Sequence, residues 1–126
     1  MGREAAQAGQ AATVVALAGG DAEAVRGEHV TRAAADGDRE AAAVIARFAW
    51  WVALGLANLA NVLDPSCIVI GGGMVESGDV LMGPTRLAFA QLVEGVAHRP
   101  EIPIKAAALG ERAGAIGAAL LARAPA

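Results

Sequence analysis

A short β-branched segment that ends on three consecutive glycines constrains this chain more than any other feature. Residues 68–70 have the composition of a buried strand, and Gly71-Gly72-Gly73 follow at once. Glycine has no Cβ, so this backbone can adopt positive φ and approach a flat or anionic ligand closely. The pattern predicts a strand that is followed by a ligand contact, by a tight turn or by a closely packed helix. The residues alone do not decide among these three interpretations.

The segment before the strand predicts one long helix. Asp38 is a suitable N-cap, and Asp64-Pro65 ends the helix because proline disfavours helical geometry at the preceding residue. Helix Arg39–Leu63 is then followed within about four residues by a strand, which is typical of α/β proteins. Apolar side chains at three- and four-residue spacing predict its buried face: Val44, Phe48, Trp51, Val52, Gly55, Leu59 and Val62.

The remaining elements follow from glycine, proline and apolar spacing. We expect helices over 3–18, over 28–35 with Gly37 as the stop, from Pro84 to about 96 and from Glu111 onward, with a strand over 101–107. Two strands are too few for an independent sheet. The sequence therefore predicts an incomplete α/β unit that needs a partner chain or more of the same protein.

Composition and charge exclude several classes of function. Of the 126 residues, 56% are hydrophobic and only 3% aromatic, which predicts a core of Ala, Val, Leu and Ile. The net charge of −3 and the scattered basic residues give no footprint for nucleic acid. The uncharged stretch 48–63 is shorter than the ~20 residues that cross a bilayer, so we expect a core helix and no membrane partner. With no visible secretory signal and a single cysteine, Cys67, we expect a cytoplasmic protein.

Few side chains are candidates for chemistry. His29 and His98 lack carboxylates or cysteines at metal-ligand spacing, so we predict surface histidines and no metal site. Asp79 is expected to cap the following turn rather than to touch a ligand. We predict no catalytic residue in this chain.

Two further pairs of residues need partners. Asn58 and Asn61 interrupt an apolar helix, and we expect hydrogen bonds to a loop rather than substrate contact. Trp50 and Trp51 must point to different sides of the helix, one into the core and the other toward a missing lobe or a dimer mate. The apolar content and the incomplete sheet predict a homo-oligomer.

Four pieces in order resemble the C-terminal part of the ROK family of bacterial glucokinases, other sugar kinases and sugar-responsive repressors. They are residues 59–65, the strand into Gly71-Gly72-Gly73, the turn Ser77-Gly78-Asp79 and the ending 108–119. The resemblance implies a C-terminal lobe segment of the actin-like ATPase (ribonuclease H-like) fold, helix-rich with few strands. It also implies that Gly71, Gly72 and Gly73 form the adenosine-side loop of an ATP cleft, and that the intact protein uses ATP and Mg²⁺ to phosphorylate glucose or a related hexose.

The resemblance also implies what this chain lacks. No Asp-x-Gly-x-Thr turn for phosphate, no Cys-x-Cys-Gly zinc pattern and no Asn-Asp pair for a sugar occur in the sequence. We therefore expect one incomplete domain, with a helical lead-in over 1–26 and the ROK segment over 27–126. Two alternatives stay open, the effector and dimerisation segment of a ROK repressor, and a non-catalytic remnant.

Overall fold

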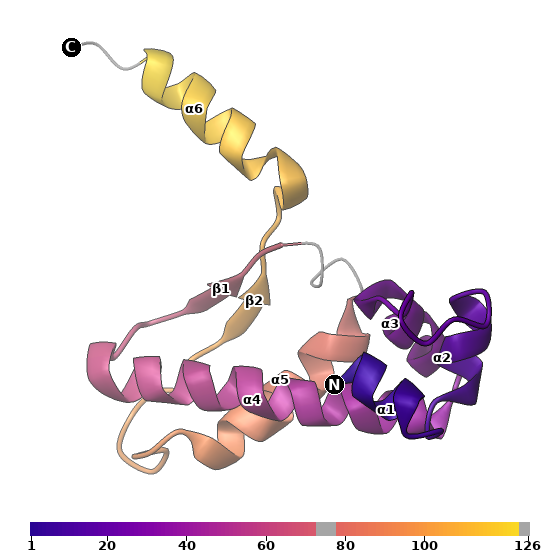
Figure 1. Cartoon of the computed structure of the whole chain (residues 1–126). Helices are drawn as coiled ribbons and strands as arrows, with labels where there is room; N and C mark the ends of the chain where they lie inside the picture. The colour runs from indigo at the N-terminus through magenta and orange to yellow at the C-terminus, as the bar shows by residue number, and fades with distance from the viewer. Residues whose placement is uncertain (73–77, 124–126) are drawn as a thin grey trace.

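The computed structural model describes residues 1–72 and 78–123. The described elements are α1 (Gly2–Gln7), α2 (Ala12–Leu17), α3 (Gly27–Ala35), α4 (Arg39–Leu63), β1 (Ile68–Ile70), α5 (Asp79–Leu92), β2 (Ile104–Ala106), the 3-10 helix η2 (Gly110–Arg112) and α6 (Ala113–Arg123). Helices α1 to α3 gather around one end of α4, the two strands lie over its other half, and α6 projects away from the sheet (Figure 1).

Helix α4 has the predicted bounds. The Asp38 carboxylate accepts a hydrogen bond from the Ala41 amide at 2.8 Å, as an N-cap should. At the other end Asp64 takes the left-handed conformation with φ of 45°, and its carboxylate accepts a hydrogen bond from the Arg99 guanidinium. Both ends of the longest element are therefore set by an aspartate.

The predicted buried face of α4 is right only in part. Val44, Phe48 and Val52 are half-buried, and Val44 and Phe48 pack against the core. Trp51, Leu59 and Val62, which we expected in the core, are exposed to 52%, 56% and 81%. The fully buried residues are Ala41, Ile45, Ala49, Ala53, Ala57 and Ala60. Alanine brings the α4 backbone close to α3 and α5, against which it packs, and Trp51, Leu59 and Val62 are left on the opposite face.

Two hydrophobic clusters share α4. Its N-terminal half packs with α1 to α3 and with Leu81 of α5, and its C-terminal half packs with Met82, Phe89, Ile102 and Ile104. The buried residues of the first cluster are all Ala, Val, Ile or Leu, as the composition predicts, whereas the second also contains the larger side chains Met82 and Phe89.

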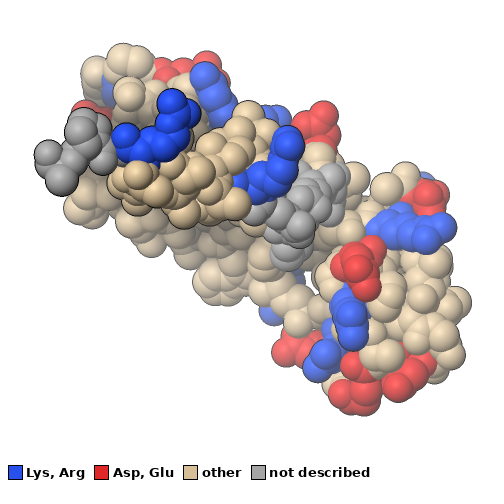
Figure 2. Space-filling view, turned by 90° about the horizontal axis from the view of Figure 1, so that it is seen from above, with Lys and Arg blue, Asp and Glu red and all other residues tan. Residues whose placement is uncertain are grey.

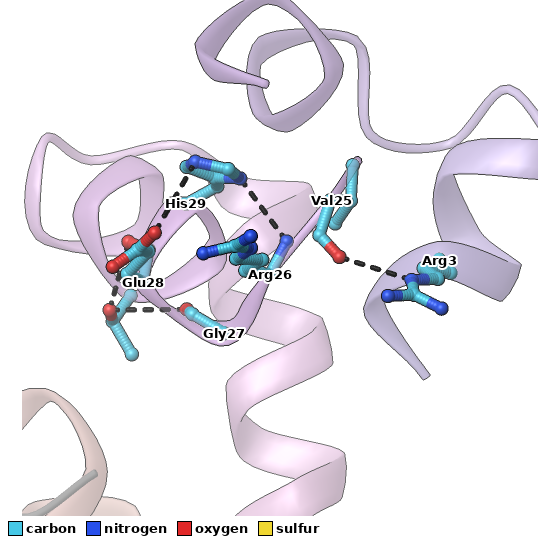
Figure 3. A network of polar contacts seen from close by, with 7 residues as sticks. Arg3, Val25, Arg26, Gly27, Glu28 and His29 are labelled. Atoms are coloured by element: carbon cyan, nitrogen blue, oxygen red, sulfur yellow. Dashed lines mark hydrogen bonds and ion pairs between the residues drawn. The ribbon is translucent and has the colours of Figure 1, made fainter. Parts of the chain in front are cut away.

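The N-terminal region is two short helices, not the single helix expected over 3–18. Helix α1 stops before Gly9, which has φ of +72°, a conformation that favours glycine. The Nε of Arg3 donates to the Val25 carbonyl oxygen at 3.2 Å and ties α1 to the start of α3 (Figure 3). There Nδ1 of His29 accepts a hydrogen bond from the Arg26 amide at 3.1 Å, which fixes the first turn of α3. We expected this histidine on the surface, but its side chain is partly buried.

Strands β1 and β2 are parallel neighbours, with Ile68 opposite Ile104 and Ile70 opposite Ala106. Helix α5 is the connection between them, so the three form a βαβ unit. Ile104 is buried, whereas Val69 on the other face of the sheet is 63% exposed. One face of the sheet is therefore covered and the other is open. Strand β2 is shorter than expected, because Pro103 has no N–H and lies outside the strand. The Pro103 carbonyl oxygen still accepts a hydrogen bond from the Ile68 amide.

Helix α5 begins at Asp79, so the predicted start at Pro84 is wrong. Pro84 lies inside the helix, where it removes one backbone hydrogen bond. Buried side chains on both sides of Pro84 stabilise the helix by packing: Leu81, Met82, Thr85 and Phe89. Among the described residues of α6, none is buried.

Charged side chains are unevenly distributed. Figure 2 shows acidic and basic side chains interspersed over the end formed by α1 to α3. In this view, that end carries no patch of purely acidic or purely basic residues. Among the described helices, α4 is long and apolar enough to cross a membrane by length and composition. Its alanine face packs against α3 and α5, as in a core helix.

Candidate functional site

The candidate site is the carboxyl edge of the sheet, where β1 and β2 end side by side. Gly71 and Gly72 follow the last residue of β1, and the Ala107 amide, directly after β2, donates to the Ile70 carbonyl oxygen at 2.8 Å. In open α/β sheets, ligands bind in the crevice outside the carboxyl ends of the strands. The sheet therefore presents this glycine pair where a ligand would be expected.

The two described glycines of the loop have different roles. A Cβ on Gly71 would lie 3.4 Å from the Ala107 Cβ, an ordinary contact between the strand ends. Gly72 has φ of +99°, and a Cβ there would meet no described atom within 4 Å. Gly71 therefore packs against the chain, whereas Gly72 leaves its backbone uncovered. Gly73, the third predicted site residue, lies outside the described residues.

The N-terminus of α5 follows this loop. Gly78 is the N-cap, with φ of 62°, and makes no side-chain capping bond; Ser77 of the predicted turn lies outside the described residues. The capping role predicted for Asp79 is wrong, because Asp79 is the first helical residue. Its exposed carboxylate lies 3.5 Å from the Arg86 guanidinium, which also donates to the Ile104 carbonyl oxygen at 3.0 Å. This contact links the start of α5 to β2.

The other candidate side chains do not gather at this edge. Asn61 accepts a hydrogen bond from the Glu94 amide at 3.2 Å, so it contacts a loop as expected, and Asn58 is exposed. His98 is exposed, and Cys67 is a partly buried free thiol. Within residues 1–72 and 78–123, no group of three His, Cys, Asp or Glu side chains could hold a metal ion.

Sequence reasoning missed one concave feature. A cavity of about 420 Å³ lies between α5 and the segment that leads into β2. Its lining is mainly apolar and includes Phe89, Val93 and Ile104, with Arg86 and Arg99 at its border. Both arginines are already engaged, Arg86 with Asp79 and Arg99 with Asp64. All of its lining residues lie within 86–104, and no sequence pattern marks the cavity because it depends on how the segment after α5 folds back along that helix.

At this edge, the chain provides backbone and small apolar side chains. Such a surface suits the flat, weakly polar face of a nucleobase or sugar better than a reacting phosphate, which requires charged or metal-bound partners.

Sequence comparison places these features in a known family. The ROK family pattern matches residues 3–125. A glucokinase of Streptomyces coelicolor is 37% identical over 116 residues, which cover 92% of this chain and 37% of the relative. A glucokinase of Halalkalibacterium halodurans is 42% identical over 89 residues, covering 70% of this chain and 26% of the relative.

Structural comparison agrees. The crystal structure of a ROK family glucokinase from Streptomyces griseus, in complex with glucose and AMPPNP, matches with a TM-score of 0.84 and 36% identity. The match covers 94% of this chain and 38% of that protein. The expected fold, a helix-rich segment of the actin-like ATPase architecture with few strands, is confirmed. The matches cover only 26% to 38% of the length of these relatives, and the chain belongs to the ROK family.

Proposed function

We propose that this chain forms the adenosine-side wall of the ATP cleft in a ROK family kinase that phosphorylates glucose or a related hexose. The observation that carries the proposal is the uncovered backbone of Gly72 at the carboxyl edge of a parallel βαβ unit. The resemblance to a glucokinase solved with glucose and AMPPNP supports a nucleotide as the ligand. On this proposal Gly71, Gly72 and Gly73 bind the nucleotide, and the protein acts in the cytoplasm.

The physical argument is one of close approach. A side chain on the loop would hold the adenosine away from the backbone, whereas glycine lets the ligand contact the peptide plane itself. Gly71 packs against Ala107 at the end of β2, whereas Gly72 has no described atom near the position of its missing side chain. One glycine therefore holds the loop in place, and the next leaves room for a ligand. The chain would thus fix the position of the nucleotide, which is a large part of phosphoryl-transfer catalysis.

The proposal assigns the chemical steps to other parts of the longer protein. A base for the sugar hydroxyl, the loop for the transferred phosphate and the sugar-binding residues would come from the region that this chain does not span. The described residues offer no metal cluster, so Mg²⁺ would enter with the nucleotide and not through ligands of this chain. The division into a lead-in over 1–26 and a ROK segment over 27–126 stays a prediction.

A chimera tests the nucleotide assignment. This chain would replace the matching 38% of the Streptomyces griseus glucokinase, and the apparent KM values for ATP and glucose would be measured for Gly72→Ala. We expect the KM for ATP to rise roughly tenfold with the KM for glucose nearly unchanged, because a methyl group lies between loop and adenosine.

A control variant separates ligand contact from backbone strain. Gly19→Ala is matched, since Gly19 has φ of +76° and a Cβ there also meets no described atom within 4 Å. It should leave both KM values unchanged. The assignment fails if Gly72→Ala leaves the ATP dependence at the unsubstituted value or changes the glucose dependence instead.

A further inference from the structure

The side chain of Arg86 joins the start of α5 to strand β2. Its Nε donates to the carbonyl oxygen of Ile104, the first residue of β2, at 3.0 Å. Its Nη1 lies 3.5 Å from Oδ1 of Asp79, the first residue of α5. Arg86 and Asp79 are about 10 Å apart along the helix axis, and side chains in a helix lean toward its N-terminus. One guanidinium therefore reaches back over two turns and contacts both elements.

The first turns of α5 have few other polar supports. Gly78 is the N-cap, and it provides no side-chain hydrogen bond to the amides of the first turn. Pro84 has no N–H, so the Val80 carbonyl does not receive the helical hydrogen bond that residue 84 would otherwise donate. The buried side chain of Leu81 holds this end of the helix by packing. Arg86 adds the polar contact that fixes it against the sheet.

The other end of the glycine loop is held at the same strand. The Ala107 amide, directly after β2, donates to the Ile70 carbonyl oxygen at 2.8 Å, and a Cβ on Gly71 would lie 3.4 Å from the Ala107 Cβ. The chain leaves β1 at this point and enters α5 at Asp79. Both ends of the loop are thus connected to β2 or to the residue after it, one through Ala107 and the other through Arg86.

We propose that Arg86 is a positioning residue for nucleotide binding: it fixes the start of α5, and with it the end of the glycine loop, against β2. This inference rests on the proposed function of the loop, and Arg86 acts through the loop rather than by contact with the nucleotide. Asp79 is 96% exposed, so its ion pair with Arg86 contributes little to global stability. A positioning role therefore predicts a larger effect on nucleotide affinity than on unfolding.

Kinetics in the chimera with the Streptomyces griseus glucokinase test this role. We expect Arg86→Gln to raise the KM for ATP roughly fivefold, which is less than the ~10²-fold effect of a 1 Å misplacement. The value of kcat and the KM for glucose should stay nearly unchanged. Arg86→Lys should have an intermediate effect, because one ammonium group keeps the charge but lacks the fork that contacts Asp79 and Ile104 together.

Arg99→Gln is the matched control. The Arg99 guanidinium also contacts an exposed aspartate, Asp64, and its side chain is 17% exposed. Asp64 precedes β1 and Arg99 precedes β2, so this pair lies at the amino edge of the sheet, away from the glycine loop. Arg99→Gln should therefore leave kcat and both KM values unchanged.

Hydrogen exchange in the 126-residue chain tests the structural step without nucleotide. The Met82 amide donates to the Gly78 carbonyl oxygen at 3.2 Å in the first turn of α5, and the Val93 amide donates to the Phe89 carbonyl oxygen at 2.9 Å at its end. We expect Arg86→Gln to raise the exchange rate at Met82 roughly threefold and to leave Val93 unchanged, because only the first turn is released. Arg99→Gln should not change the exchange rate at Met82.

The outcomes separate this inference from the proposed function. The inference is overturned if Arg86→Gln raises exchange at Met82 and Val93 equally or at neither. It is also overturned if Gly72→Ala raises the KM for ATP and Arg86→Gln does not, or if Arg99→Gln raises it as much as Arg86→Gln. If Gly72→Ala leaves the KM for ATP unchanged, the proposed function itself fails, and the inference falls with it whatever the exchange at Met82.

Discussion

At the scale of single residues, Asp38 shows how one side chain sets the start of α4. Its carboxylate accepts hydrogen bonds from the Ala41 amide at 2.8 Å and from the Thr13 hydroxyl at 2.6 Å. The first bond satisfies an amide that has no partner inside the helix, and the second fastens α2 to the same point. These bonds, the one from Ala41 first, lower the pKa of Asp38 below its ordinary value.

We predict that Asp38→Ala lowers the Tm by roughly 4 °C, because the variant loses the cap and the contact with Thr13. Asp38→Asn should retain most of the capping effect, since asparagine is a comparable N-cap. Thermal unfolding followed by circular dichroism measures both variants. Equal Tm values for Asp38→Ala and the unsubstituted chain would contradict the capping role.

The same residue gives a prediction about pH. A carboxyl with a lowered folded pKa contributes its stability fully above its unfolded pKa, and that contribution is lost as the pH falls through the folded pKa. The stability advantage of the unsubstituted chain over Asp38→Ala should therefore be constant from pH 7 to 5 and shrink below about pH 4. Unfolding curves at pH 7, 5 and 3 measure it, and a gap that widens toward pH 3 would refute the assignment.

At the scale of elements, the bounds of α3, α4 and β1 could be predicted to within a residue, but the orientation of α4 could not. Capping residues and proline act within a few positions of the chain, so their effect can be read directly from the sequence. Which face of α4 is buried depends on how closely α3 and α5 approach. Alanine and the larger apolar residues both follow a helical spacing on this helix. Hydrophobicity alone favours burial of the larger residues, but Trp51, Leu59 and Val62 are exposed and the alanines are buried.

The alanine face makes a prediction of its own. Ala57 is 1% exposed against α5 and the sheet, so Ala57→Leu adds a side chain where there is no space and should destabilise the chain by about 1–3 kcal/mol. Ala46→Leu, at an exposed position of the same helix, should change stability by less than about 0.5 kcal/mol. Urea unfolding at one fixed protein concentration compares the two, and equal effects would mean that the alanine face is not closely packed.

At the scale of the whole chain, the sequence predicted an incomplete α/β unit, and the structure agrees in particular places. The open face of the sheet exposes Val69, and α6 carries Leu120 and Leu121 exposed to 62% and 78%. Both surfaces lack an apolar partner among the described residues. The position of the glycine loop could be predicted because strand and glycines are adjacent in sequence, whereas the contact of Gly71 with Ala107 depends on the pairing of β1 with β2, which are distant in sequence.

The chain by itself should phosphorylate no sugar. Phosphoryl transfer requires a base near the sugar hydroxyl and cationic groups or a metal around the transferred phosphate. At the carboxyl edge of the sheet the described loop residues are Gly71, Gly72 and Ala107, which provide neither. Glu76, the acid nearest in sequence, lies outside the described residues, and Asp79, the next one along the chain, is engaged with Arg86.

A coupled assay with glucose and ATP measures this directly, with a heat-inactivated sample as the blank and the chimera as the positive control. We expect turnover from the chimera and none from the 126-residue chain. If the purified chain turned over ATP in proportion to glucose, a base and a phosphate site would have to exist within these residues. The assignment of the glycine loop to binding alone would then be wrong.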